Sequence, residues 1–191
     1  SPACTVIYAP QADFLGSDSF SSTVIAAAGG DAGATVTLEV VNLPTGTSTV
    51  LVEYWGGIAG NAVSDLTASP NFPSSPTARF FTNSAFEVYH NYGDNYGARY
   101  RTLLVPPVSG DYTFWIASDD SGELWFSTNS NPAAKARIAY NTSYASYRQW
   151  TKFTSQRSSS IPLVAGRRYY MEALQKEGTS GDHLSVAWAG P

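Results

Sequence analysis

The chain has 191 residues, of which 43% are hydrophobic and only 14% are charged, and its net charge is −4. A chain of this length and apolar content can bury at least one substantial core. Its 11 lysine and arginine residues form no basic cluster that could follow a phosphate backbone, and no apolar run approaches the roughly 20 residues that span a bilayer. We therefore expect no nucleic-acid partner and no membrane insertion.

Aromatic residues make up 14% of the chain and occur together with many Thr, Val and Gly residues. These residue types suit pleated strands and tight turns better than helices, so we expect an all-β fold. Cys4 is the single cysteine, so no internal disulfide can form. The first residues, Ser-Pro-Ala-Cys, lack the charged and apolar regions of a signal peptide, and we expect the chain to be a piece of a larger protein.

The first 44 residues differ in texture from the rest. The run from Tyr8 to Phe20, YAPQADFLGSDSF, resembles the cadherin-like or bacterial Ig-like repeats of very large surface proteins, and covers about half of one module. The resemblance implies a partial Ig-like β-sandwich segment, which we place at residues 1–44. Strands are predicted in it at 5–8, 22–25 and 34–41, with a Gly-rich turn at 29–33.

Residues 45–191 are predicted to form a second domain. Pro, Gly and hydroxyl residues at 42–48 interrupt two strand-like runs, which is typical of a linker. Beyond them, many short apolar and aromatic runs alternate with turn signals and predict a sandwich or a closed barrel. Residues 57–76 have too little apolar periodicity for a regular element. Strands are predicted at 50–55, 86–90, 98–105, 110–117, 123–127, 137–140, 152–153, 161–163, 168–174 and 184–188.

Two adjacent carboxylates, Asp119 and Asp120, follow the predicted strand at 110–117. Neighbouring side chains on an extended chain point to opposite sides, so two adjacent Asp can hold one ion only where the backbone is bent abnormally. The sequence Asp-Asp-Ser-Gly also suits an ordinary β-turn with Asx hydrogen bonds. The dipeptide by itself favours the turn and leaves the metal site open.

Two further runs carry a resemblance to a known family. The segment from Tyr96 to Tyr112, YGARYRTLLVPPVSGDY, leads into the acidic loop, and PLVAGRRYYMEAL follows at 162–174. Together they resemble the PA14 domain, over residues 50 to 191, and imply a PA14-type β-sandwich or barrel. In lectin members of that family, two adjacent Asp joined by a cis peptide bond hold one calcium ion, which binds two hydroxyls of a sugar. Asp119 and Asp120 match that pair.

The resemblance places a second calcium loop at residues 175–183. Calcium takes about six to eight oxygen ligands, more than two carboxylates supply. Lectin members provide an Asn or Gln side chain and several carbonyl oxygens at this position, and Glu177 departs from that pattern, which leaves the ligand set open. Asp182 is a ligand or simply a turn residue. The candidates are the side chains of Gln175, Glu177 and Asp182 and the backbone carbonyls of Lys176 and Thr179.

Specificity for a sugar would come from side chains around the ion. An aromatic face can stack on sugar C–H groups, and Asn, Asp and Lys can bond the remaining hydroxyls. Each candidate has the alternative of being an ordinary exposed loop residue. The candidates for this rim are Tyr92, Asp94, Asn95, Lys176 and His183, beside Asp119 and Asp120 themselves.

The sequence contains no nucleophile elbow, phosphate loop or Cys/His pair, so we expect no enzyme. The resemblance implies a calcium-dependent lectin module of a large secreted or cell-surface bacterial adhesin, a monomeric unit of a long repeat protein. Its partners would be glycans with glucose-, fucose- or mannose-type diols on cell or biofilm surfaces. Two alternatives stay open: a spacer stabilised by calcium without sugar binding, and a substrate-targeting domain of a glycosidase.

Overall fold

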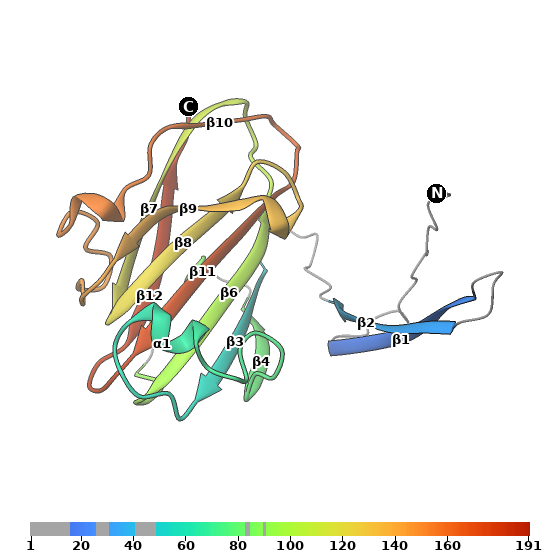
Figure 1. The fold of residues 1–191 in the computed structure, drawn as a ribbon. Helices are drawn as coiled ribbons and strands as arrows, with labels where there is room; N and C mark the ends of the chain where they lie inside the picture. Colours follow the sequence, from blue (N-terminus) through green and yellow to red (C-terminus); the bar gives the residue numbers. More distant parts are fainter. Residues whose placement is uncertain (1–15, 26–30, 41–48, 83–84, 90) are drawn as a thin grey trace. The chain divides into compact units, whose positions relative to one another are not determined.

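The computed structural model describes residues 16–25, 31–40, 49–82, 85–89 and 91–191. The chain divides into two compact units, Ser1–Asn42 and Leu43–Pro191. In the first unit, β1 (Gly16–Ile25) pairs antiparallel with β2 (Asp31–Val40), as Figure 1 shows. Both strands are longer than the sequence predicts. β1 begins six residues before the strand expected at 22–25, and β2 begins inside the turn expected at 29–33.

The strand expected at 5–8 and the whole linker expected at 42–48 lie outside the described residues. The hairpin of β1 and β2 has ten residue pairs in register, from Gly16 opposite Val40 to Ile25 opposite Asp31. A hairpin of this kind occurs in many β folds, so the Ig-like assignment of this segment stays a prediction.

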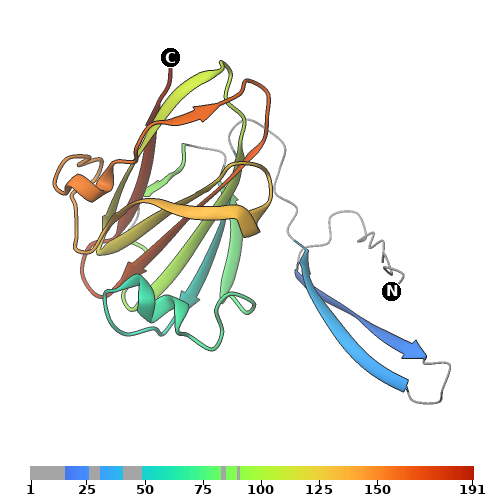
Figure 2. The ribbon, with the colours of Figure 1, turned by 45° about the horizontal axis from the view of Figure 1, so that its top comes forward.

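The second unit is an all-β sandwich, as predicted, built from two antiparallel sheets stacked face to face (Figures 1 and 2). Among the described residues, one sheet has the strand order β4-β3-β6-β11-β8-β9 and the other the order β10-β7-β12-β5. The bounds of the first are β3 Val50–Gly56, β4 Ala78–Thr82, β6 Tyr96–Leu104, β8 Ser121–Ser127, β9 Lys135–Asn141 and β11 Tyr169–Glu177. Those of the second are β5 Glu87–Tyr89, β7 Gly110–Asp119, β10 Ile161–Leu163 and β12 His183–Ala189.

The core lies between the sheets and follows from the two-residue period of the strands. On β7, every second side chain faces inward, and Phe114 and Ile116 are fully buried. They meet apolar side chains of the six-stranded sheet, among them Met171 and Leu124. Burial of side chains this large stabilises the fold by on the order of 1.5–3 kcal/mol each.

The stretch at 57–76 contains α1 (Val63–Thr67), so the prediction of no regular element there was wrong. Val63 and Leu66 lie three residues apart on one turn, and both are buried. Leu66 packs directly on Gly97 of β6, where the absence of a Cβ leaves room for it. A helix of five residues is too short to show the repeated apolar period by which helices are recognised in a sequence.

The structure differs from the predicted strands in two places. Residues 152–153 form no strand and instead precede a 3₁₀ turn, η2 (Thr154–Gln156). The Gln156 side-chain amide donates a hydrogen bond to the Ile116 carbonyl and so holds this turn against β7. Strand β4 was not predicted, because its central residues Phe80 and Phe81 are adjacent aromatics that show no alternation. A second 3₁₀ turn, η1 (Pro132–Ala134), precedes β9. The strand predicted at 86–90 is observed as β5, with residue 90 outside the described range.

The outer face of the six-stranded sheet carries a buried ionic cluster. Glu53 of β3 has no exposed surface, and its carboxylate pairs with Arg79 at 2.9 Å, Arg99 at 2.8 Å and Arg101 at 2.7 Å. A buried carboxylate is tolerated only when it is paired and hydrogen-bonded, and these contacts link β3, β4 and β6. No helix among the described residues is long and apolar enough to cross a membrane.

Candidate metal and ligand site

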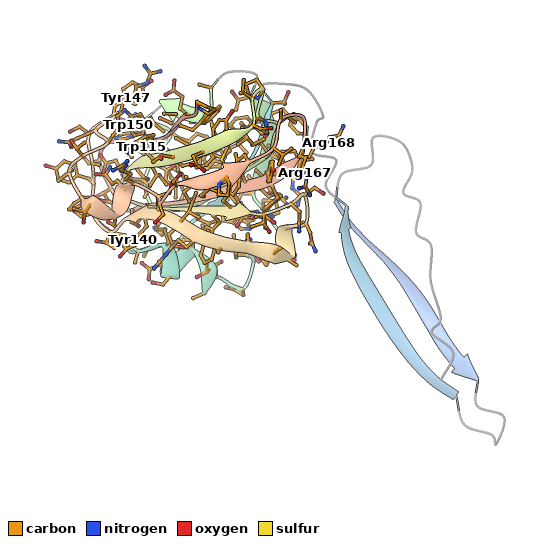
Figure 3. The ribbon with its side chains drawn as sticks, turned by 90° about the horizontal axis from the view of Figure 1, so that it is seen from above. Trp115, Tyr140, Tyr147, Trp150, Arg167 and Arg168 are labelled. Atoms are coloured by element: carbon orange, nitrogen blue, oxygen red, sulfur yellow. The ribbon has the colours of Figure 1, made fainter. Side chains whose placement is uncertain are left out.

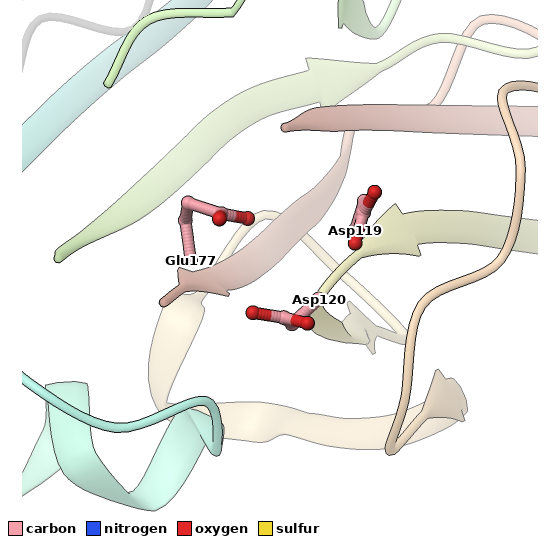
Figure 4. A group of neighbouring side chains, drawn as sticks. All are labelled: Asp119, Asp120 and Glu177. Carbon is pink, nitrogen blue, oxygen red and sulfur yellow. The ribbon is translucent and has the colours of Figure 1, made fainter. Parts of the chain in front are cut away.

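Three carboxylates converge at one end of the sandwich (Figure 4). Asp119 ends β7, Asp120 joins it to β8, and Glu177 ends β11. Oxygen atoms of the three carboxylates lie within 4.8 Å of one another. The peptide bond between Asp119 and Asp120 is cis, as the family resemblance implies. We refer to these three residues as the carboxylate cluster.

The sheet register explains why Glu177 joins the aspartates. Ser121 of β8 pairs with Lys176 of β11, so the residue that precedes Ser121 and the one that follows Lys176 are neighbours. The backbone N–H of Gly178 donates to Asp120 Oδ2 at 2.9 Å and holds that carboxylate at the strand end. Ordinary antiparallel pairing therefore brings Asp120 and Glu177 together, although more than fifty residues separate them in the sequence.

Burial, with a further contribution from neighbouring negative charges, raises the pKa values of two carboxylates in the cluster. Burial raises the pKa of Asp119 to about 6, with further contributions from Asp120 and Asp182. Burial raises the pKa of Glu177 to about 8, and the charges of Asp120 and Asp119 add to the effect. Both carboxylate oxygens of the buried Glu177 lack a hydrogen-bond partner among the described residues. A buried acceptor group without a partner needs a proton or a cation, and carboxylate oxygens are ligands that hard cations such as calcium prefer.

The side-chain oxygen of Gln175, the atom that could bind a cation, is engaged by another residue. Its amide oxygen accepts a hydrogen bond from the Tyr100 hydroxyl at 2.6 Å. Its amide nitrogen donates to the carbonyls of Asp119 at 2.9 Å and His183 at 3.1 Å. The buried side chain therefore ties β11 to both loops of the site, and its hydrogen-bonding atoms are engaged there.

Lys176 is likewise no exposed rim residue in this structure. Its side chain is fully buried, and the ammonium group donates to the carbonyls of Gly60 and Glu177. Its backbone lies in the middle of the sheet, opposite Gly97 of β6 and Ser121 of β8. Thr179, the other predicted carbonyl ligand, lies in the exposed part of the loop that follows β11.

Asp182 fastens one loop to another. Its carboxylate Oδ2 accepts hydrogen bonds from the backbone N–H groups of Tyr92 at 2.7 Å and Gly93 at 3.1 Å. Its own N–H donates to the Asn91 side chain at 3.2 Å. The loop at 91–95 is thereby joined to the loop at 178–182, and Asp182 acts on the cluster mainly through its charge.

Asp94 and Asn95 complete this junction. Asp94 Oδ1 accepts from the Ser180 N–H at 3.0 Å, and the Asn95 N–H donates to the Gly178 carbonyl at 2.6 Å. Asn95 has a φ of 54°, a left-handed conformation that Asn adopts more readily than most residues. The rim predicted from the sequence therefore includes residues whose polar groups hold the two loops together.

Tyr92 and His183 differ in exposure. The Tyr92 ring stacks on Tyr54 with centroids 4.2 Å apart and an angle of 12°, and 53% of the residue remains exposed. His183 is buried, and its Nε2 donates to the Ala145 carbonyl at 2.7 Å. Burial lowers the pKa of His183, which favours a neutral imidazole.

An open pocket of about 780 Å³ adjoins the carboxylate cluster at Asp119. One wall comes from the loop between β9 and η2, which the sequence prediction missed. Its Tyr144 and Tyr147 have exposed rings, and Figure 3 shows Tyr147 and Trp150 at the end of the domain opposite Arg167. Closely spaced tyrosines in a polar loop were the available signal. The lining residues are Asn91, Asp119, Tyr144, Ser146, Tyr147, Gly181, Asp182 and His183.

Two sequence relatives share this domain. The chain is 37% identical over 134 residues to mouse N-acetyl-beta-glucosaminyl-glycoprotein 4-beta-N-acetylgalactosaminyltransferase 1, and 32% identical over 135 residues to mouse fibrocystin-L. The matches cover 68% and 71% of this chain but only 13% and 3% of the relatives. The chain thus corresponds to a small part of each.

A solved structure has the same fold. The A domain of epithelial adhesin 9 from Candida glabrata, in complex with Galb1-3GlcNAc, has a TM-score of 0.55 at 14% identity, covering 76% of this chain and 83% of that one. The family model of the PA14 domain matches residues 60–191. This match includes all three carboxylates and the pocket wall. The chain belongs to the PA14 domain family.

Proposed function

We propose that residues 43–191 form a calcium-dependent carbohydrate-binding module. The observation that carries the proposal is the buried Glu177 carboxylate, which lacks hydrogen-bond partners among the described residues and lies beside Asp119 and Asp120. A charge in this position is stabilised by a cation that the three carboxylates hold together. The cluster adjoins an open pocket through Asp119, so a ligand can reach it.

The residues present fit calcium. The cluster offers carboxylate oxygens, the ligand type of calcium and magnesium, and no thiolate or imidazole of the kind that selects zinc. Calcium takes six to eight oxygens, so three carboxylates leave positions for loop carbonyls and for two vicinal hydroxyls of a sugar. Asp119, Asp120 and Glu177 would hold the ion, with carbonyls of the 178–182 loop as further candidates.

The pocket supplies the contacts that a sugar ring needs besides its hydroxyls. Tyr144 is 53% exposed and Tyr147 is 37% exposed, and both line the pocket that contains Asp119. Aromatic faces bind the C–H faces of sugars, and Asn91 and Ser146 offer polar groups for remaining hydroxyls. The similar adhesin domain solved with Galb1-3GlcNAc supports a glycan as the ligand class. Candidate glycans carry glucose-, fucose- or mannose-type diols.

The biological setting follows from this chemistry. Calcium is plentiful outside cells, which suits a secreted or cell-surface protein that attaches to glycans on cells or biofilms. We propose that the module serves adhesion, as a bacterial adhesin domain, and does not itself catalyse a reaction. Relatives that match over only 13% and 3% of their length support a module that serves larger proteins of different kinds.

The test is a glycan array with the labelled chain, run in calcium and again in excess chelator, for the parent protein and for Glu177→Gln. Asp111→Asn is the matched control, since Asp111 lies on β7 at the end opposite Asp119 and is exposed. Calcium-dependent binding by the parent and the control, lost in Glu177→Gln, supports the proposal. Calorimetry with calcium chloride measures calcium binding in parallel: calcium binding without any glycan binding would favour the structural spacer instead, and no calcium binding would overturn both.

A further inference from the structure

Lys176 places a buried positive charge next to the carboxylate cluster. Its side chain is fully buried, and its ammonium group donates to the Gly60 carbonyl at 2.5 Å and to the Glu177 carbonyl at 2.6 Å. An ammonium group is costly to remove from water unless its protons meet acceptors. One acceptor lies at the end of β11, and the other lies in the segment before α1, 116 residues away. The side chain therefore joins two distant parts of the chain.

The turn that Lys176 holds is fastened at two other points. The Ser121 hydroxyl donates to the Asn61 carbonyl at 2.5 Å, and the Ile58 N–H donates to the Asn95 carbonyl at 2.7 Å. Ser121 follows Asp120, and Asn95 is bonded to Gly178. All three anchors of the 57–61 turn thus lie at the edge of the carboxylate cluster.

The anchored turn places an exposed amide beside the site. A Cβ on Gly178 would lie 2.5 Å from Asn61 Oδ1 and 3.1 Å from Nδ2, so the Asn61 amide lies directly against this glycine. Gly178 in turn donates to Asp120. The pocket tyrosines line the same pocket as Asp119, whereas Asn61 lies against Gly178, which is bonded to Asp120. An amide offers both a donor and an acceptor to a polyhydroxy ligand.

We propose that Lys176 is a positioning residue: its buried ammonium holds the 57–61 turn against the end of β11, and thereby sets the Asn61 amide as a ligand contact. The first half stands independently, and the second rests on the proposed function. The charge has a further effect. A cation next to three carboxylates weakens the attraction of the cluster for a second cation, so Lys176 limits the affinity for calcium.

The test uses the full chain with Lys176→Met, and Arg167→Met as a control with the same change in charge at the far end of the domain (Figure 3). In calcium-free buffer, amide hydrogen exchange at 57–62 should be about tenfold or more faster in Lys176→Met only, as expected for loss of a charge-assisted hydrogen bond. Calcium affinity, measured by calorimetry with calcium chloride, should stay equal or increase. Unchanged exchange at 57–62 would overturn the positioning role, and a calcium affinity that falls would overturn the effect of the charge on calcium binding.

A second variant tests the ligand contact separately from the anchoring. Asn61→Ala changes an exposed side chain and should leave stability and calcium affinity unchanged. Its affinity for a monosaccharide that the parent binds, taken from L-fucose, D-glucose and D-mannose, should fall by about tenfold, as for one lost hydrogen bond to a ligand. Equal affinity for parent and Asn61→Ala overturns the ligand contact. If none of the three sugars binds the parent, the proposed function fails and the ligand contact with it, while the exchange experiment still decides the anchoring.

Discussion

Glu177 lies beside Asp120 because the β8–β11 register pairs Ser121 with Lys176, so the carboxylates on either side of this pair become neighbours. The acidic loop brings two charges, and the strand end brings a third that has no hydrogen-bond partner among the described residues. The sheet therefore creates a site that neither sequence segment contains by itself. The cation proposed for this site leads to the first predictions.

Replacing both aspartates, Asp119→Ala with Asp120→Ala, should abolish calcium binding and sugar binding. In saturating calcium the melting temperature of this variant should lie below that of the parent, because a ligand that binds only the folded state stabilises it. In chelator the two proteins should remain folded. Calorimetry and thermal melts with and without calcium measure this, and equal melting curves at saturating calcium would contradict it.

The ion-free protein should lose stability as the pH rises. The folded-state pKa values of about 6 for Asp119 and about 8 for Glu177 lie above their ordinary values of 3.8 and 4.5. The folded state therefore binds more protons than the unfolded state between these limits, and the free energy of unfolding falls as pH rises toward 8. Melts in chelator from pH 5 to pH 8 measure the slope. Glu177→Gln should flatten it and Asp111→Asn should not; an equal slope in both would contradict the assignment.

Saturating calcium should remove this loss of stability at high pH. A bound cation replaces the protons, so the cluster is stabilised in its charged form and binding weakens as the pH falls toward 5. Calcium titrations at pH 5, 6, 7 and 8 measure the change, with Asp111→Asn as the control. A calcium affinity that is constant over this range would show that the carboxylates are not the ligands.

The pocket tyrosines should affect sugar binding and leave calcium binding unchanged. Tyr144→Ala and Tyr147→Ala each remove an exposed aromatic face from the pocket wall. Loss of such a contact, worth about 0.5–1.5 kcal/mol, corresponds to a roughly two- to tenfold weaker affinity for a bound monosaccharide. Tyr140→Ala, on β9 and outside the pocket lining, is the control. Equal sugar affinities in all three variants would exclude the wall as a ligand contact.

Glu53 should be essential for folding stability and irrelevant to the ligand. Removing the carboxylate in Glu53→Gln leaves the buried guanidinium groups of Arg99 and Arg101 without their counter-charge, and breaking a buried ion pair costs about 3–5 kcal/mol. Glu123→Gln, which removes a partly exposed carboxylate from its pair with Arg137, should cost about 0–1 kcal/mol. Urea denaturation of both variants measures the difference, and similar losses would contradict the proposed role of burial.

The sequence by itself determined the all-β class, most strands and the acidic pair. The alternation of apolar and polar residues is a local property that can be read from the sequence. Phe114 and Ile116 are two residues apart in such a run, and both are buried in the core. Asp119 and Asp120 are adjacent in the chain, so a motif could identify them. Helix α1 and strand β4 were missed because a five-residue helix and adjacent phenylalanines carry too little periodicity.

The tertiary structure alone decided which other residues meet the acidic pair. The sheet register places the Glu177 carboxylate beside the aspartates. The neighbouring side chains on the same strand end make other contacts: Gln175 is hydrogen-bonded to Tyr100, and Lys176 donates to the Gly60 carbonyl. The pocket wall of Tyr144 and the amide of Asn61 come from loops far away in the sequence. Side-chain direction on a buried strand depends on the partners across both sheets, and these contacts are long-range and cannot be inferred from local pattern.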